Sequence, residues 1–261
     1  MDEKELLFTQ VLGCSRADLY LDPKRKLDRS VTSVISRTLR RRICGEPLEY
    51  ILGTGDFMGF EFKINDDVLI PRPETEILAE TVLKNASNLE AHGKRYGILE
   101  IGTGSGCIAV SLAKALPQAR ITATDISAAA LRVAKENAKL HAVDKKINFI
   151  QCDLFPARGR HKLIVSNPPY IPTEDIKKLQ PEIQYEPSLA LDGGNEGLGL
   201  IRRIIKQAPS YLEKQGLLIL EIGFDQHERV LNILEQSQNF KLKEAVMDYN
   251  NIIRVIVAAA T

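Results

Sequence analysis

The tetrapeptide Asn167-Pro168-Pro169-Tyr170 is the strongest chemical signal in the sequence, because it follows directly on the apolar run 163–166. Two consecutive prolines fix two φ angles and remove two backbone donors, so the chain leaves the strand along a stiff edge. The amide oxygen of Asn167 and the main-chain oxygen of Pro168 can then hold both protons of a planar NH2 group and aim its nitrogen at an electrophile. Tyr170 can stack on a flat amide or base. A proline-stiffened surface turn would explain the prolines but not the asparagine at a strand end.

A glycine-rich turn, Gly102-Thr103-Gly104-Ser105-Gly106, lies between the apolar run 98–101 and a helical pattern. Ligands bind at this end of the strands in an open α/β sheet, and glycine lets a ligand lie against the backbone. The dinucleotide fingerprint would need a further glycine at position 107, which is Cys107. The G-x-G-x-G spacing therefore predicts a different ligand, and a plain strand-to-helix turn is the simpler alternative.

Acidic residues stand at strand ends beside this turn. Glu100 precedes the glycines, and Asp125 ends the next apolar run, where its carboxylate could accept hydrogen bonds from both hydroxyls of a ribose. Alternatively, Asp125 or Ser127 could cap the helix that follows. Asp153 is placed to meet an adenine edge, an assignment weakened by the frequency of acids in turns.

The elements that must position these residues follow from alternating apolar runs and helical patterns. Strands are predicted at 97–101, 121–124, 147–152, 162–166 and 217–222, with helices at 107–116, 128–140 and 198–211. This order predicts an α/β fold with a doubly wound, mainly parallel sheet. After a helix near 227–236, the runs 240–247 and 252–258 predict a closing pair of strands that brings in an antiparallel member.

The first part of the chain predicts a separate unit. Residues 1–48 have apolar residues at helical spacing, with Asp28 or Ser30 available as a helix cap. Aromatic residues and glycines between 50 and 64 predict a β-hairpin within a linker at 49–73. We therefore expect a small helical module, a hairpin linker and a main domain at 74–261.

Bulk properties narrow the class of protein. There are 35 Lys and Arg against 34 Asp and Glu, so no global positive field draws in nucleic acid, and no direct nucleic-acid binding is expected. Arg40, Arg41 and Arg42 form a local basic cluster, most simply a solvated helix face and otherwise a docking point. The chain shows no basic and apolar leader and no apolar run of membrane-spanning length, which predicts a cytoplasmic location without membrane binding. The scattered cysteines predict reduced thiols, and no metal site is expected.

The glycine turn, Asp125 and the tetrapeptide together resemble class I methyltransferases that use S-adenosylmethionine to methylate amino nitrogens. These act on adenine in DNA, guanine in ribosomal RNA or glutamine in protein, and the tetrapeptide alone does not choose among them. Three further segments, 45–53, 69–76 and 186–198, resemble the HemK/PrmC family of release factor glutamine methyltransferases over nearly the whole chain.

The resemblance implies a set of roles. Glu100, the glycine turn with its Thr103 and Ser105, and Asp125 would bind S-adenosylmethionine. Asn167 would touch both cofactor and substrate. Pro168, Pro169 and Tyr170 would hold the glutamine of a Gly-Gly-Gln loop. Leu154 replaces a tryptophan that some members place against the adenine. Arg72 is a candidate substrate contact, although the segment around it could equally be an ordinary helix entry.

The implied function is methyl transfer to a release factor glutamine by a monomeric enzyme whose partners are class I peptide chain release factors. Two alternatives stay open. A nucleic-acid methyltransferase could use the same site on a base, but it would want a basic groove. A nucleotide-binding protein without enzymatic activity could use the same sheet.

Overall fold

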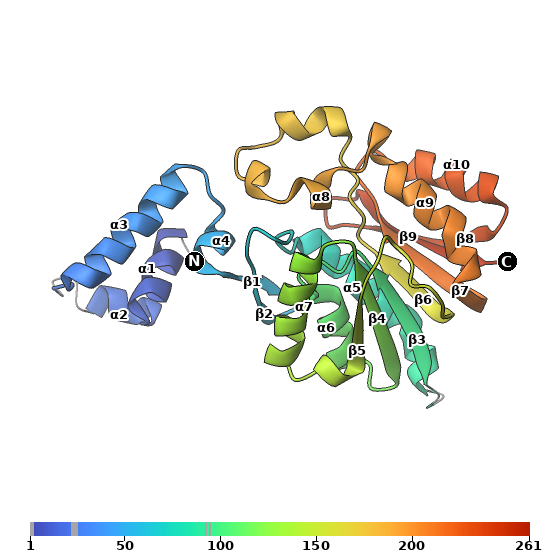
Figure 1. Ribbon diagram of the computed structural model, residues 1–261, viewed down its shortest axis with the longest axis horizontal. Coiled ribbons are helices and arrows are strands. Elements are labelled where there is room, and N and C mark those ends of the chain that lie inside the picture. The colour runs from blue at the N-terminus through green and yellow to red at the C-terminus, as the bar shows by residue number, and fades with distance from the viewer. Residues whose placement is uncertain (1–2, 22–25, 92, 94) are drawn as a thin grey trace.

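The computed structural model describes residues 3–21, 26–91, 93 and 95–261, and Figure 1 shows a small helical module beside a larger unit built on a sheet. The module consists of α1 (Glu3–Leu12), α2 (Arg16–Leu21), α3 (Arg29–Ile43) and α4 (Leu48–Leu52). Asp28, not Ser30, occupies the N-cap position of α3, where its main-chain oxygen accepts from the Thr32 amide at 2.9 Å. The helical pattern predicted for this part of the chain is confirmed.

A β-hairpin follows the module, as predicted. Strands β1 (Thr54–Phe57) and β2 (Phe60–Lys63) are antiparallel, and Met58 and Gly59 turn between them with φ of 52° and 73°. Positive φ at both turn residues matches the right-handed twist of the strands. Phe57 and Phe62 are buried, and in Figure 1 the hairpin lies between the module and the main sheet. The division into domains at residues 48 and 73 remains a prediction.

The main sheet has seven strands in the order β5-β4-β3-β6-β7-β9-β8. The strands are β3 (Tyr96–Ile101), β4 (Ala119–Asp125), β5 (Ile147–Gln151), β6 (His161–Ser166), β7 (Leu212–Glu221), β8 (Phe240–Met247) and β9 (Ile253–Ala260). Strands β3 to β7 pair in parallel, whereas β9 is antiparallel to both β7 and β8. The doubly wound, mainly parallel sheet with an antiparallel member is therefore confirmed.

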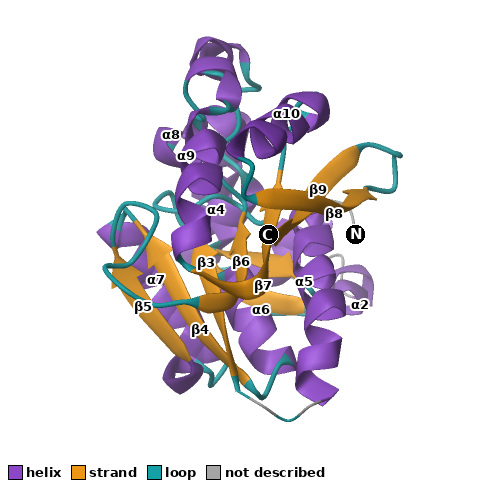
Figure 2. Cartoon of the chain, turned by 90° about the vertical axis from the view of Figure 1, so that its right-hand side faces the viewer, coloured by secondary structure: helices purple, strands orange, loops and turns teal. Residues whose placement is uncertain are grey.

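Helices cover both faces of this sheet. The helices are α5 (Pro73–Ala91), α6 (Cys107–Ala115), α7 (Ala128–Leu140), α8 (Ser188–Leu191), α9 (Gly199–Gln207) and α10 (His227–Ser237). Neighbouring strand residues point to opposite faces, so Ile98 packs in the core under α5, α6 and α7, and Leu99 packs in the core under α9 and α10. Figure 2 shows α9 and α10 on one side of the sheet and α5 and α6 on the other.

Two element boundaries differ from the sequence prediction by more than two residues. The helix expected at 198–211 ends at Gln207 and continues as the 3-10 turn η5 (Ala208–Ser210), because Pro209 has no amide proton for a helical bond. The strand expected at 217–222 already begins at Leu212, where the polar stretch 213–215 hid it from an apolar pattern. No helix within the described ranges combines the length and hydropathy needed to cross a membrane.

The segment between β6 and α9 contains short turns that the sequence did not predict. They are η2 (Thr173–Lys178), η3 (Ile183–Tyr185), α8 and η4 (Asn195–Gly197). This segment reaches the helical module, since the Tyr185 hydroxyl donates to the Cys44 main-chain oxygen at 2.9 Å and Arg42 pairs with Glu182 at 2.6 Å.

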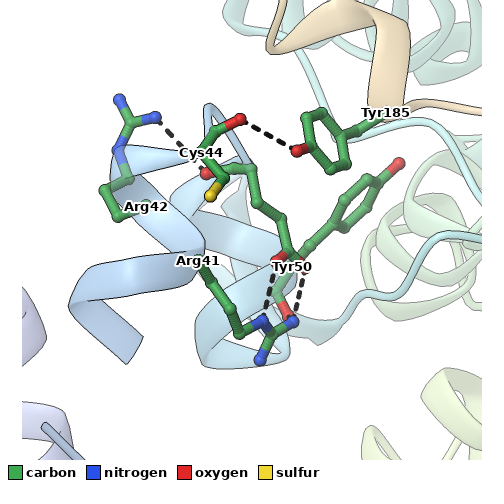
Figure 3. Close-up of polar contacts among 6 residues, drawn as sticks. Arg41, Arg42, Cys44, Tyr50 and Tyr185 are labelled. Carbon is green, nitrogen blue, oxygen red and sulfur yellow. Dashed lines mark hydrogen bonds and ion pairs between the residues drawn. The ribbon is translucent and has the colours of Figure 1, made fainter. Parts of the chain in front are cut away.

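Figure 3 shows Arg41 and Arg42, two residues of the basic cluster at the end of α3, beside the bond between Tyr185 and Cys44. Arg41 donates to the Glu46 carboxylate from its Nε at 2.7 Å, and Arg42 also pairs with Glu3. Arg40 is exposed. Two of the three arginines therefore stabilise the module and its contact with the main domain, rather than forming a uniformly solvated face.

Candidate active site

A cavity of about 680 Å³ opens at the carboxyl ends of β3, β4 and β6. From β3 the chain adds β4 and β5 on one side and then β6 and β7 on the other. Ligands bind in open α/β sheets at such a change in the direction of the strand order. The parallel register pairs Ile101 with Ser166 and with Thr124, so the residues that follow these strands emerge side by side. The predicted residues on the cavity wall are Gly102, Gly104, Asp125, Asp153, Leu154, Asn167, Pro168 and Pro169.

The glycine turn adopts backbone conformations that explain its composition. Gly102, Gly104 and Gly106 have φ of 72°, 55° and 80°, a region that favours glycine. A Cβ atom on Gly102 or Gly104 would have no described atom within 4 Å, so the chain is bare where it faces the cavity. A Cβ atom on Gly106 would lie 3.0 Å from Ala134, which makes this glycine a packing residue between α6 and α7.

Glu100 lies behind the turn and not on the cavity wall. It is 1% exposed and accepts a hydrogen bond from the Thr103 hydroxyl at 2.7 Å. Burial raises the pKa of its carboxyl to about 8. Thr103 and Ser105 are buried as well. Contacts of these three side chains with a cofactor remain predictions, and the bonds present hold the shape of the turn.

Asp125 faces the cavity from the end of β4. Its Oδ2 accepts from the Gly104 amide and its Oδ1 from the Ser127 amide, both at 2.9 Å. Of the two possible caps for α7, Ser127 is the one used, since its hydroxyl accepts from the Ala130 amide at 3.1 Å. Burial raises the pKa of Asp125, and backbone amides lower it. Each carboxylate oxygen keeps a lone pair for a further donor.

Asp153 and Leu154 border the cavity beyond β5. The Asp153 carboxylate is exposed and pairs with Arg203 at 2.6 Å, so part of its charge is already matched. Leu154 has φ of 68°, and its main-chain oxygen accepts from the Thr124 hydroxyl at 2.8 Å. The unusual backbone at Leu154 shapes this edge of the cavity beside the end of β4.

The tetrapeptide is divided between the cavity and the core. Asn167, Pro168 and Pro169 line the cavity, and the Asn167 Nδ2 donates to the Thr75 hydroxyl at 3.0 Å. Tyr170 packs instead against the core under α9 and α10, where its hydroxyl donates to the Glu221 Oε1 at 3.3 Å. Burial raises the pKa of Tyr170. A stacking role for Tyr170 remains a prediction, because its ring lies outside the residues that line the cavity.

Arg72 also lies off the cavity wall. It pairs with Glu186, whose other oxygen accepts from the Ile70 amide at 3.1 Å. The Glu186 side chain is 1% exposed, so this pair joins the segment before α5 to the segment before α8. A substrate contact by Arg72 remains a prediction beside this structural role.

Several residues that hold the site were given no role from the sequence, although Thr75 and Gly197 lie in the segments 69–76 and 186–198 that carry the family resemblance. Gln226 is 2% exposed, donates to the Tyr170 main-chain oxygen at 2.9 Å and to the Gly197 oxygen at 3.2 Å, and accepts from Gly223. Gly197 has φ of 68°, and a Cβ atom there would lie 2.0 Å from the Tyr170 carbonyl oxygen. Thr75 and Glu221 contact the tetrapeptide from α5 and β7. In the ranges that the structure describes, no group of three or more His, Cys, Asp or Glu could hold a metal ion.

Comparisons with known proteins agree over nearly the whole chain. Residues 2–53 match the PrmC N-terminal domain and residues 74–183 match the Methyltransferase small domain. A release factor glutamine methyltransferase from Geobacter sulfurreducens is 41% identical over 257 residues, which are 97% of this chain and 87% of that protein. One from Coxiella burnetii is 42% identical over 259 residues, covering 98% and 90%.

Solved structures with low identity share the fold. A methyltransferase from Pyrococcus furiosus has a TM-score of 0.57 at 17% identity, over 86% of this chain and 98% of that one. A ribosomal protein L11 methylase from Lactobacillus delbrueckii subsp. bulgaricus has a TM-score of 0.55 at 21% identity, over 76% and 84%. The sheet and its helices are therefore of the class I methyltransferase kind.

Proposed function

Because the chain belongs to the release factor glutamine methyltransferase family, we propose that it transfers a methyl group from S-adenosylmethionine to the side-chain amide nitrogen of a release factor glutamine. The observation that carries the proposal is the placement of Asn167 and Pro168 on the wall of a cavity that the glycine turn also lines. A stiff pair of acceptors beside a bare backbone suits an NH2 group and a nucleoside held next to each other.

The residues present suit S-adenosylmethionine. Gly102 and Gly104 leave open space at the cavity, and Asp125 offers carboxylate oxygens to the ribose hydroxyls. Asp153 and Leu154 would border the adenine. The sulfonium of this cofactor supplies an activated methyl carbon, so the protein needs to orient the acceptor rather than to create a strong electrophile.

Orientation is the main task of the chain because an amide nitrogen is a poor nucleophile. The Asn167 Oδ1 and the Pro168 main-chain oxygen would each accept one proton of the glutamine NH2 group. These acceptors favour the positive charge that develops on nitrogen as it attacks. Correct placement of reactants can lower a barrier by roughly 7–11 kcal/mol.

A direct assay tests this proposal. Incubation of the protein with S-adenosylmethionine and a purified class I release factor should add one methyl group to the glutamine of the Gly-Gly-Gln loop. Mass spectrometry of the digested release factor locates the modification, and a release factor with that glutamine replaced by alanine is the control. Absence of incorporation at saturating cofactor would refute the proposal.

Replacing Asp125 with asparagine should weaken cofactor binding by roughly 10- to 100-fold, the range expected for losing a hydrogen bond to a charged acceptor. An amide would also set an NH2 group against the Gly104 or Ser127 amide. Isothermal titration calorimetry measures the dissociation constant. Asp153→Asn is the matched control and should change it less, because Asp153 is exposed and paired with Arg203. Equal affinities of wild type and Asp125→Asn would contradict the ribose assignment.

The setting of the reaction is part of the same proposal. We place the protein in the cytoplasm, where release factors would be its partners, and expect a monomer to carry a complete site. The four cysteines are free thiols, as suits a reducing compartment.

A further inference from the structure

Thr75 is a buried polar residue in direct contact with the amide-binding asparagine. It lies in the first turn of α5 and is 3% exposed. Its hydroxyl oxygen accepts a hydrogen bond from the Asn167 Nδ2 at 3.0 Å. The nitrogen of the Asn167 amide therefore points at α5, and its oxygen takes no part in this bond and can accept from another donor.

Glu221, at the end of β7, is a buried carboxylate that contacts the same tetrapeptide as Thr75. Glu221 is 1% exposed, and its Oε1 accepts from Tyr170 at 3.3 Å. Its Oε2 is buried and has no hydrogen-bond partner within the described residues, so this oxygen lacks a donor. Burial raises the pKa of this carboxyl, and Thr75 and Tyr170 beside it lower it. A carboxylate only accepts hydrogen bonds. A proton from Thr75 would satisfy this oxygen, and the Thr75 oxygen would then only accept, as it does from Asn167.

We propose that Thr75 and Glu221 are positioning residues that fix the Asn167 amide with its oxygen toward the substrate NH2 group. This inference rests on the proposed function. An asparagine amide rotated by half a turn would present its own NH2 group to that of the glutamine, which places donor against donor. When the Glu221 carboxylate accepts the Thr75 proton, the Thr75 oxygen can only accept from the Asn167 NH2 group, which excludes the rotated amide.

Thr75→Val keeps the shape of the side chain and removes the hydroxyl. We expect kcat to fall about 10-fold, the effect of one lost hydrogen bond, with the KM for the release factor and the cofactor affinity changed less than about twofold. Thr75→Ser restores the hydroxyl and should recover most of the rate. Thr81→Val is the matched control, because Thr81 is 4% exposed on the same helix and its hydroxyl bonds only the helix carbonyl of Ile77 at 2.7 Å among the described contacts.

Wild-type kcat in Thr75→Val, equal losses in Thr75→Val and Thr81→Val, or no rescue by serine would each overturn the inference. A second readout does not need methyl transfer. In 15N-labelled protein the side-chain NH2 resonance of Asn167 should shift in Thr75→Val and stay in place in Thr81→Val. An unmoved resonance also overturns the inference, whereas an inactive wild type with a moved resonance would count against the proposed function alone.

Glu221→Gln tests the proposed link from Glu221 through Thr75 to Asn167. A glutamine can turn its NH2 group to Thr75, which frees the hydroxyl proton to face Asn167, so we expect kcat to fall at least about 10-fold. Burial raises the pKa of Glu221 to about 7, and Glu74 on α5 raises it further. Thr75, Tyr170 and Arg254 on β9 act in the opposite direction and lower this pKa. The carboxylate form is the one required, so wild-type kcat should rise with pH through this range. The same inflection in Glu221→Gln would overturn the role of Glu221.

Discussion

Asn167→Ala is expected to lower kcat by roughly 100-fold or more, as loss of one preorganised polar group at a reacting centre often does. The alanine removes one of the two oxygens that hold the acceptor NH2 group, and the glutamine nitrogen would no longer be fixed on the line of attack. Cofactor affinity should change less, because Asp125 and the glycine turn remain on the cavity wall. Single-turnover methylation of a release factor, with cofactor binding measured separately, gives both quantities.

Asn85→Ala is the matched control for this substitution. Asn85 is also part-buried, and its side-chain amide donates to the Thr81 main-chain oxygen at 2.9 Å, on the same helix that holds Asn167 through Thr75. It lies outside the residues that line the cavity, so its loss should leave kcat unchanged. A wild-type kcat for Asn167→Ala would remove the asparagine from the mechanism.

The sheet was predictable because its strands obey local rules. Buried parallel strands read as apolar runs, and the run before Asn167 and the run before Gly102 are both of this kind. Once the strands are known to be parallel, their carboxyl ends share one edge, which brings Gly102, Asp125 and Asn167 together. The start of β7 at Leu212 was missed because the polar residues 213–215 interrupt the apolar pattern.

The roles of single side chains were harder to predict because they depend on contacts distant in sequence. Nothing near Arg72 indicates that Glu186 will pair with it, and Gln226 stands in a turn without any recognisable motif. The stacking role of Tyr170 remains a prediction, and the bond from its hydroxyl to Glu221 on β7 was not predicted from the sequence. The choice between Asp125 and Ser127 as the cap of α7 also needed geometry, because both residues stand within reach of the helix start.

Gly197→Ala is expected to reduce kcat by roughly 100-fold, since misplacing a catalytic segment by about 1 Å has effects of that size. A Cβ atom at Gly197 would lie 2.0 Å from the Tyr170 carbonyl oxygen and 2.7 Å from the Gln226 Nε2. The carbonyl must therefore move, and the prolines transmit the shift to Asn167 because they leave the segment few other conformations. Overpacking and a left-handed alanine together should lower the free energy of unfolding by about 2–5 kcal/mol.

Gly59→Ala separates backbone strain from the clash. Gly59 has φ of +73°, close to the +68° of Gly197, but its Cβ atom would have no described atom within 4 Å. The control should therefore lose only about 1–2 kcal/mol of stability and keep its kcat. Thermal unfolding and steady-state methylation of both variants make the comparison. If Gly197→Ala matched Gly59→Ala in both measurements, the Tyr170 carbonyl would be free to move without disturbing Asn167, and close packing behind the tetrapeptide would not be what holds the acceptor oxygens in place.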